Sequence, residues 1–277
     1  MEKIKIEKNT VQETLIIPLY GRKMCSEKFP ELYTDVFAKE LCERLDYDFS
    51  ELEKKKNSFL YEFGALEAAM RQLGVMWEIK NYLKKHSKAT IVNLGCGLDE
   101  TGKACDNGLC QIVNIDFPDV ISVRKQLISE GEREKSVACD LKDYSWMDEV
   151  DSSNGVIFFA AGVFYYFKME EVKSLVLELS KRYPDGCLIF DSGGKAVLKL
   201  MMKTVVKNMG IDSVEGYFYV NNPEKDLKWS EKIKVSSKGY MLGYYDLKSP
   251  GINFLHRLFA TMGDKLMKMS INRLDFE

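Results

Sequence analysis

The order of apolar and polar residues divides the chain into two parts. Within 66–83, apolar side chains recur at nearly helical spacing, as Leu66, Ala69, Met70, Leu73, Met76, Trp77 and Leu83. Such a stripe predicts a helix that packs one face against a core, and most of the first 88 residues follow this pattern. From about residue 89, short apolar runs alternate instead with helical stretches.

Five of these runs predict buried strands: TIVNLG (90–95), CQIVNID (110–116), SVACDL (136–141), GVIFFAAG (155–162) and CLIFDSG (187–193). Between the last two, the stretch 170–183 carries four apolar residues at helical spacing, Val172, Leu175, Val176 and Leu179. Alternation of strands and helices predicts an α/β fold with a mostly parallel sheet covered on both faces.

The C-terminal third is less regular. A helix is expected over 195–210, a mixture of strand and loop over 229–245, and a last strand over 271–276. No repeat or linker interrupts the chain, so we expect a single domain over 1–277. Residues 1–88 then form a helical cap, and 89–277 form the sheet core with a C-terminal segment on the substrate side.

Composition excludes several classes of protein. The 277 residues carry 40 basic and 42 acidic side chains, a net charge of −2 that argues against a dedicated nucleic-acid binder. The seven cysteines form no CxxC pair, which predicts no zinc site and suits a reducing compartment. The N-terminus lacks an apolar signal core, and the longest apolar run (155–167) is too short for a bilayer. We expect a cytoplasmic protein with no membrane partner and no bound metal.

The segment IVNLGCGLDETGKA (91–104) is the first candidate site, because ligands of open α/β sheets bind beyond the carboxyl ends of the strands. The dinucleotide fingerprint G-x-G-x-x-G fails here, since Glu100 occupies the third glycine position. The triphosphate motif G-x-x-x-x-G-K also fails, since Ala104 replaces the magnesium-binding Ser or Thr. Acidic residues in the loop would also repel phosphate.

A nucleoside ligand without phosphate, S-adenosylmethionine, suits the same turn better. A short G-x-G turn lets the backbone approach the amino-acid end of this ligand. Asp116 ends the next predicted strand about 20 residues later, where a carboxylate can accept both ribose hydroxyls. Asp140, in the CDL that ends the third predicted strand, is expected to accept from the adenine amino group, with the Leu141 backbone at the ring edge.

Several segments, in order and spacing, resemble one family: ATIVNLGCGLDET, NIDFPDVISVRKQLI, SVACDLKDYSWMDEV and the long stretch from IFFAAGVFYYF to CLIFDSGG. It is the family of class I S-adenosylmethionine methyltransferases that groups leucine carboxyl methyltransferases with tetracenomycin-type polyketide O-methyltransferases. The resemblance covers roughly 14–193 and includes the leading helices, TLIIPLYGRK and EFGALEAAMRQLGVMWEIKNYL. It implies a class I methyltransferase fold with an N-terminal helical cap.

The resemblance also implies individual contacts. Arg71 matches the arginine that pairs with the carboxylate of the donor, and Arg22 is a second basic contact. The turn from Gly95 through Cys96 to Gly97 would line the methionine end. One position departs from the family pattern: Ala161 stands where an acidic residue often precedes the glycine after the fourth strand. A carboxylate for the donor's amino group is missing there, and Asp99 or a backbone carbonyl is expected to compensate.

On the acceptor side, Tyr165 and Tyr166 follow the fourth predicted strand and are expected to line the pocket. The chain has only two histidines. His86 precedes the first strand, at the wrong end of the sheet, and His256 is expected to be packed. No general base is therefore assigned, which suits an acceptor that is already anionic, a carboxylate or an acidic phenol.

The sequence thus predicts an O-methyltransferase that acts on a carboxyl or phenolic oxygen of a small molecule, polyketide-like or another secondary metabolite. Two alternatives stay open. The first is a methyltransferase for a protein C-terminal carboxyl group. The second is a non-catalytic regulatory protein that binds S-adenosylmethionine, and the missing acidic residue at Ala161 is the reason to keep it. The sequence does not identify the acceptor or the oligomeric state.

Overall fold

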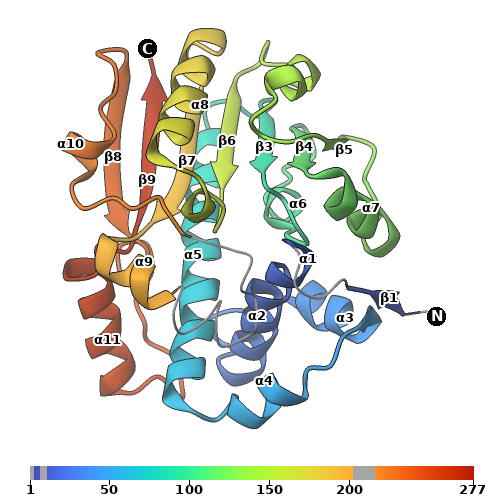
Figure 1. Cartoon of the computed structure of the whole chain (residues 1–277), viewed down its shortest axis with the longest axis vertical. Helices are drawn as coiled ribbons and strands as arrows, with labels where there is room; N and C mark the ends of the chain where they lie inside the picture. The colour runs from blue at the N-terminus through green and yellow to red at the C-terminus, as the bar shows by residue number, and fades with distance from the viewer. Residues whose placement is uncertain (1–2, 7–10, 202–215) are drawn as a thin grey trace.

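A seven-stranded sheet forms the centre of the computed structural model, which describes residues 3–6, 11–201 and 216–277 (Figure 1). The strand order is β5-β4-β3-β6-β7-β9-β8. The strands are β3 (Thr90–Leu94), β4 (Gln111–Asp116), β5 (Glu134–Ala138), β6 (Val156–Ala160), β7 (Cys187–Ser192), β8 (Ile233–Gly239) and β9 (Ser270–Phe276). The first five are parallel, whereas β9 runs antiparallel to both β7 and β8.

Buried apolar runs explain why these segments form inner strands. All residues of β3 and β6 are buried, as expected for a parallel sheet covered on both faces. Successive side chains point to opposite faces, so Ile91 joins one core and Val92 the other. The first core includes α2 (Ile16–Lys28), α5 (Phe59–Leu83) and α7 (Pro118–Leu127), and the second includes α8 (Met169–Arg182).

The N-terminal helices lie beyond the carboxyl ends of β3 and β6 (Figure 1). They are α1 (Val11–Thr14), α2, α3 (Val36–Arg44), α4 (Ser50–Lys55) and the first half of α5, accompanied by a two-stranded pair, β1 (Ile4–Lys5) and β2 (Leu45–Asp46). Their helical character is as predicted for 1–88, and they cover the edge of the sheet at which ligands of this fold class bind.

The remaining elements are short, apart from one helix of twelve residues. They are α6 (Thr101–Ala104), η1 (Tyr144–Glu149), η2 (Phe164–Tyr166), α9 (Lys195–Met201), α10 (Pro223–Asp226) and α11 (Phe254–Lys265). The predicted helix over 195–210 is present to Met201, and its part over 202–210 lies outside the described residues. Helix α11 was not predicted. No helix in the described part of the chain is long and apolar enough to cross a membrane.

One predicted strand is wrong at both ends. The apolar letters of SVACDL predicted 136–141, but β5 covers Glu134–Ala138. Its position is set by parallel pairing with β4, in which Ile112 faces Glu134 and Asp116 faces Ala138. Asp140 therefore lies in the loop after β5 rather than at the end of the strand.

Candidate functional site

The glycine turn after β3 directly contacts the carboxylate that ends β4. The backbone N–H of Gly97 donates to Asp116 Oδ2 at 2.7 Å, and the N–H of Phe117 donates to Oδ1 at 2.8 Å. Burial raises the pKa of Asp116, and these two N–H groups oppose the shift. Asp116 is 8% exposed, so it is a buried carboxyl group held by two backbone N–H groups.

The turn needs glycine at both positions. Gly95 and Gly97 have φ values of +69° and +48°, in the left-handed region that L side chains rarely adopt. A Cβ atom at Gly95 would lie 2.7 Å from Val163, and one at Gly97 would lie 2.8 Å from Leu15. Between them, Cys96 is buried, and burial raises its thiol pKa, so the thiol stays uncharged.

A second group of contacts surrounds Asp191, at the carboxyl end of β7. Its Oδ1 accepts from the N–H of Gly162 at 2.6 Å, and its Oδ2 accepts from Tyr165 Oη at 3.0 Å and from Arg71 Nη1 at 3.2 Å. Asp191 is 1% exposed, whereas the Arg71 side chain is 20% exposed. We call these four residues the Asp191 cluster. The hydrogen bond from Arg71 Nη1 to Asp191 holds one edge of the guanidinium, and the other N–H groups of Arg71 remain available to a ligand.

The two groups of contacts are neighbours. Gly162 has φ +76°, and a Cβ atom there would lie 3.1 Å from Arg71 Nη1. The next residue, Val163, packs over Gly95. Burial disfavours the charge of Arg71, but Asp191, Tyr240 and Tyr165 together outweigh this effect and raise the Arg71 pKa, so the guanidinium stays charged. Arg71 thus lies beside Gly162, and its predicted contact with the donor carboxylate stays a prediction.

Arg22 also reaches the turn, from helix α2. Its Nε donates to Asp35 Oδ2 at 2.9 Å, and Nη2 donates to the carbonyl of Leu98 at 3.3 Å. Burial disfavours its charge, but Asp99, Tyr33 and Asp35 together outweigh burial and raise the pKa. Arg22 is 7% exposed and holds the loop against the cap; its predicted donor contact stays a prediction.

Asp99 does not present a carboxylate to the site. Its Oδ1 accepts from Gln72 at 3.0 Å and from the Thr101 hydroxyl at 2.8 Å, and its Oδ2 accepts from Asn93 at 3.4 Å. The loop is also held by Arg124, which donates to the carbonyls of Gly97 and Asp99. Asp99 is therefore part of the loop framework and is a poor replacement for an acid at Ala161.

Asp140 and Leu141 follow β5, beside Asp116. The N–H of Cys139 donates to the Asp116 carbonyl at 2.9 Å, which ties the two strand ends together. Asp140 is half-buried and accepts from the Lys142 N–H at 2.9 Å, while Leu141 is buried. Both residues thus lie on the predicted side of the sheet, but none of their contacts within the described residues specifies an adenine ring, so that role stays a prediction.

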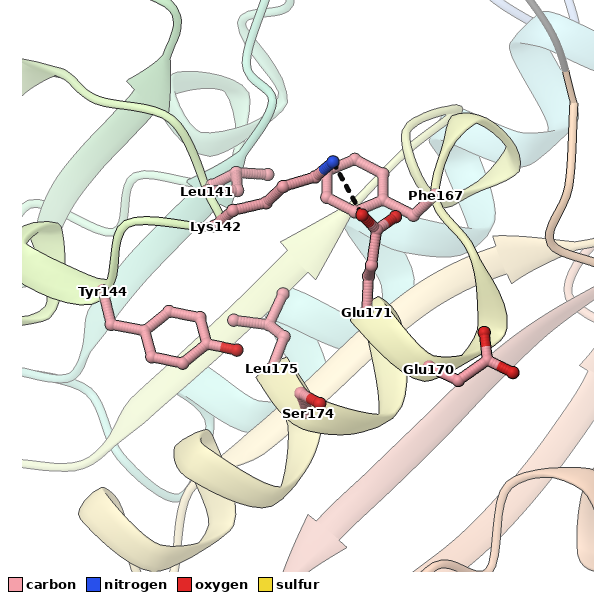
Figure 2. A pocket seen from close by; sticks show the side chains of 8 residues that line it. All are labelled: Leu141, Lys142, Tyr144, Phe167, Glu170, Glu171, Ser174 and Leu175. Carbon is pink, nitrogen blue, oxygen red and sulfur yellow. Dashed lines mark ion pairs between the residues drawn. The ribbon is translucent and has the colours of Figure 1, made fainter.

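A pocket of about 250 Å³ lies next to Leu141, between the loop after β5 and the start of α8 (Figure 2). Lys142 and Glu171 form an ion pair of 2.8 Å across it, and Lys142 Nζ lies 5.5 Å from the centre of the Phe167 ring. Sites for whole ligands usually measure about 300–1,000 Å³. This pocket is therefore sized for part of a ligand.

The two acceptor-side tyrosines differ in their surroundings. Tyr165 is buried and its hydroxyl is committed to Asp191, which makes it part of the Asp191 cluster. Tyr166 is half-buried on the same short helix, η2. Sequence reasoning missed Asp191, although a carboxylate at the end of a buried parallel strand is the same signal that identified Asp116.

Neither histidine lies in this region. His86 packs beside Gly155, which precedes β6 at the opposite end of the sheet. His256 is 1% exposed between Phe29 and Phe59, with Nδ1 accepting from the N–H of Asn253 at 3.2 Å. As predicted, His256 is a packed residue.

Comparison with known proteins agrees with this geometry. The sequence model of the family described as leucine carboxyl methyltransferase matches residues 18–180. The chain is 27% identical over 184 residues to the tetracenomycin polyketide synthesis O-methyltransferase TcmP of Streptomyces glaucescens, a match that covers 66% of each chain. It is 25% identical over 270 residues to the S-adenosyl-L-methionine-dependent methyltransferase dpfgK of Gibberella zeae, covering 88% of this chain and 89% of the relative.

The fold also recurs among solved structures. A DUF574 family protein from Streptomyces avermitilis superposes with a TM-score of 0.61 at 12% identity, covering 92% of this chain and all of the other. At this identity the likeness concerns the fold alone.

Proposed function

Because the chain belongs to the leucine carboxyl methyltransferase family, whose members are S-adenosylmethionine-dependent methyltransferases, we propose that it methylates an oxygen of a small molecule. The acceptor is a carboxyl or phenolic group of a polyketide-like or other secondary metabolite. The relative named for tetracenomycin synthesis supports this substrate class. The observation that carries the proposal is the hydrogen bond between Gly97 and Asp116 at the carboxyl edge of the parallel strands, with Arg71 held beside Gly162 after β6 at the same edge.

The residues present fit S-adenosylmethionine. The glycine turn permits close backbone approach, Asp116 offers a buried carboxylate to ribose hydroxyls, and Arg71 offers a charged guanidinium to a carboxylate. When bound, the donor supplies an electrophilic methyl group on a sulfonium. The protein then has to align the acceptor oxygen with this group and keep water out. Tyr166, on η2 beside the Asp191 cluster, is positioned to line the acceptor side.

The experiment is a methyl-transfer assay with the full chain, S-adenosylmethionine and a panel of aromatic carboxylic acids, phenols and a peptide with a free C-terminus. Mass spectrometry is expected to detect one added methyl group on a small aromatic acceptor. Mild alkali separates the two chemistries, because it cleaves a methyl ester and leaves an aryl methyl ether intact. The matched control is Asp116→Ala, which should lose the reaction.

Two results would contradict the proposal. Methylation of the peptide alone favours a protein C-terminal carboxyl methyltransferase. No product with any acceptor, together with clear donor binding, favours a non-catalytic protein that retains the fold.

A further inference from the structure

An acidic side chain lies one helical turn from Arg71 on the same face of α5. Residues four apart on a helix are surface neighbours, about 5–6 Å between Cβ atoms, and Glu67 precedes Arg71 by this spacing. Glu67 is half-buried. Among the residues that the structure describes, its side chain forms no hydrogen bond and no ion pair.

The surroundings of Glu67 make this lack of a close partner notable. Arg71, on the same helix, and the buried Tyr240, which follows β8, both interact electrostatically with it. Behind Arg71 lie Asp191 and Tyr165 of the Asp191 cluster. Burial raises the pKa of Glu67 to about 7, and the charge of Arg71 opposes this shift only in part. Glu67 is thus a carboxyl group that a second cation would stabilise.

The donor carries such a cation next to its carboxylate, because both belong to one α-amino acid. If Arg71 binds the carboxylate, the ammonium group lies within a few ångströms of it. Asp99 is occupied by the loop, and Asp191 is 1% exposed and already accepts three hydrogen bonds. Glu67 lies one helical turn from Arg71, and its carboxyl group has no hydrogen-bond partner among the described residues, so its oxygens are free for a ligand cation.

We propose that Glu67 binds the ammonium group of the methyl donor. Glu67 and Arg71 then together bind the two charged groups at its amino-acid end. The assignment rests on the donor position given under the proposed function. It concerns binding alone and requires no acceptor.

A proton should leave the protein when the donor binds. A bound ammonium favours the charged form of Glu67, whose pKa burial raises to about 7. Binding of S-adenosylhomocysteine, which keeps both charges of the amino-acid end, should therefore release a fraction of a proton near neutral pH. Calorimetry in two buffers with different ionisation enthalpies measures this number directly.

The test compares the wild type, Glu67→Gln and the matched control Glu178→Gln, a half-buried glutamate on α8 that packs on the other core. The ligands are S-adenosylhomocysteine and its deaminated form, which keeps the carboxylate. Glu67→Gln should weaken S-adenosylhomocysteine about tenfold or more and abolish proton release. It should leave the deaminated ligand within about threefold, and Glu178→Gln should behave as the wild type.

Unchanged affinity and proton release in Glu67→Gln would overturn the assignment, and so would an equal loss for both ligands. Failure of the proposed function is a separate result. A wild type that releases the proton but methylates no acceptor supports the Glu67 assignment and refutes the O-methyltransferase proposal.

Discussion

Replacing Arg71 by Met tests the amino-acid end of the donor site. The guanidinium is 20% exposed and held on one edge by Asp191, so its contact with a ligand carboxylate is partly shielded from water. A hydrogen bond to a charged group contributes about 1.5–3 kcal/mol, and every 1.4 kcal/mol changes affinity tenfold. Arg71→Met should therefore weaken S-adenosylhomocysteine by about 10- to 100-fold.

Two ligands separate this contact from a general effect on the fold. 5′-Methylthioadenosine shares the adenosine part but has no amino-acid end, so Arg71→Met should change its affinity by less than about threefold. Arg71→Lys, which keeps the charge but loses the planar fork, should weaken S-adenosylhomocysteine by an intermediate factor. Isothermal titration calorimetry measures all of these affinities.

The variant will also lose stability, because Asp191 keeps only the donors Gly162 and Tyr165. A cost of about 1–3 kcal/mol is expected for one lost partner of a buried acceptor, so circular dichroism should first establish that the variant is folded. Equal weakening of both ligands would refute the reasoning, because it would mean that Arg71 acts through the fold. Unchanged binding of S-adenosylhomocysteine would refute the contact itself.

Three further predictions follow from single contacts. Asp116→Ala should weaken S-adenosylhomocysteine and 5′-methylthioadenosine alike, by about tenfold or more in calorimetry, because both carry the ribose; loss of one ligand alone would contradict the assignment. Gly162→Ala should lower the free energy of unfolding by about 1–2 kcal/mol in a denaturant titration, because φ is +76° and the new Cβ atom meets Arg71; an unchanged midpoint would show that the strain is relieved. Burial lowers the pKa of His256 below its usual 6.5, so the unfolded chain binds its proton first and stability should fall as the pH drops below about 6.5. In His256→Phe, the melting temperature should fall less over this pH range than in the wild type. An identical pH profile in the two proteins would exclude His256 as the cause of the loss of stability.

The strands that the sequence predicted well are those buried on both faces. For β3, β4, β6 and β7, a continuous apolar run bounded by turn residues reflects burial directly, and the observed ends differ from the predicted ones by at most two residues. The strand β5 lies at the sheet edge, where pairing with β4 rather than apolar content sets its limits. Helix α11 was not predicted, although Phe254, Leu255, Leu258 and Phe259 recur at helical spacing; in the structure these four side chains are exposed.

The residues of the candidate site also differ in how far the sequence predicts them. Gly95, Gly97 and Asp116 could be found because each follows a recognisable strand within one short stretch of sequence. The Asp191 cluster could not, because it joins α5, the end of β6, η2 and β7, and residues 120 apart in the sequence meet only in the folded chain. Glu67 gave no signal either, since a single acidic residue in a helical pattern usually lies on a solvated face.

The most direct test of the central claim is a thermal-shift comparison with S-adenosylmethionine, S-adenosylhomocysteine, NAD and Mg-ATP in parallel. A ligand at 100 times its dissociation constant adds about 2.7 kcal/mol of stability, or roughly 5–10 °C for a chain of this size. The account predicts that only the two S-adenosyl compounds raise the melting temperature, and that Asp116→Ala lowers the shift to about half or less, as a tenfold or greater loss of affinity requires. A shift with NAD or Mg-ATP, or none with the S-adenosyl compounds, would contradict the donor site at the Gly95–Gly97 turn.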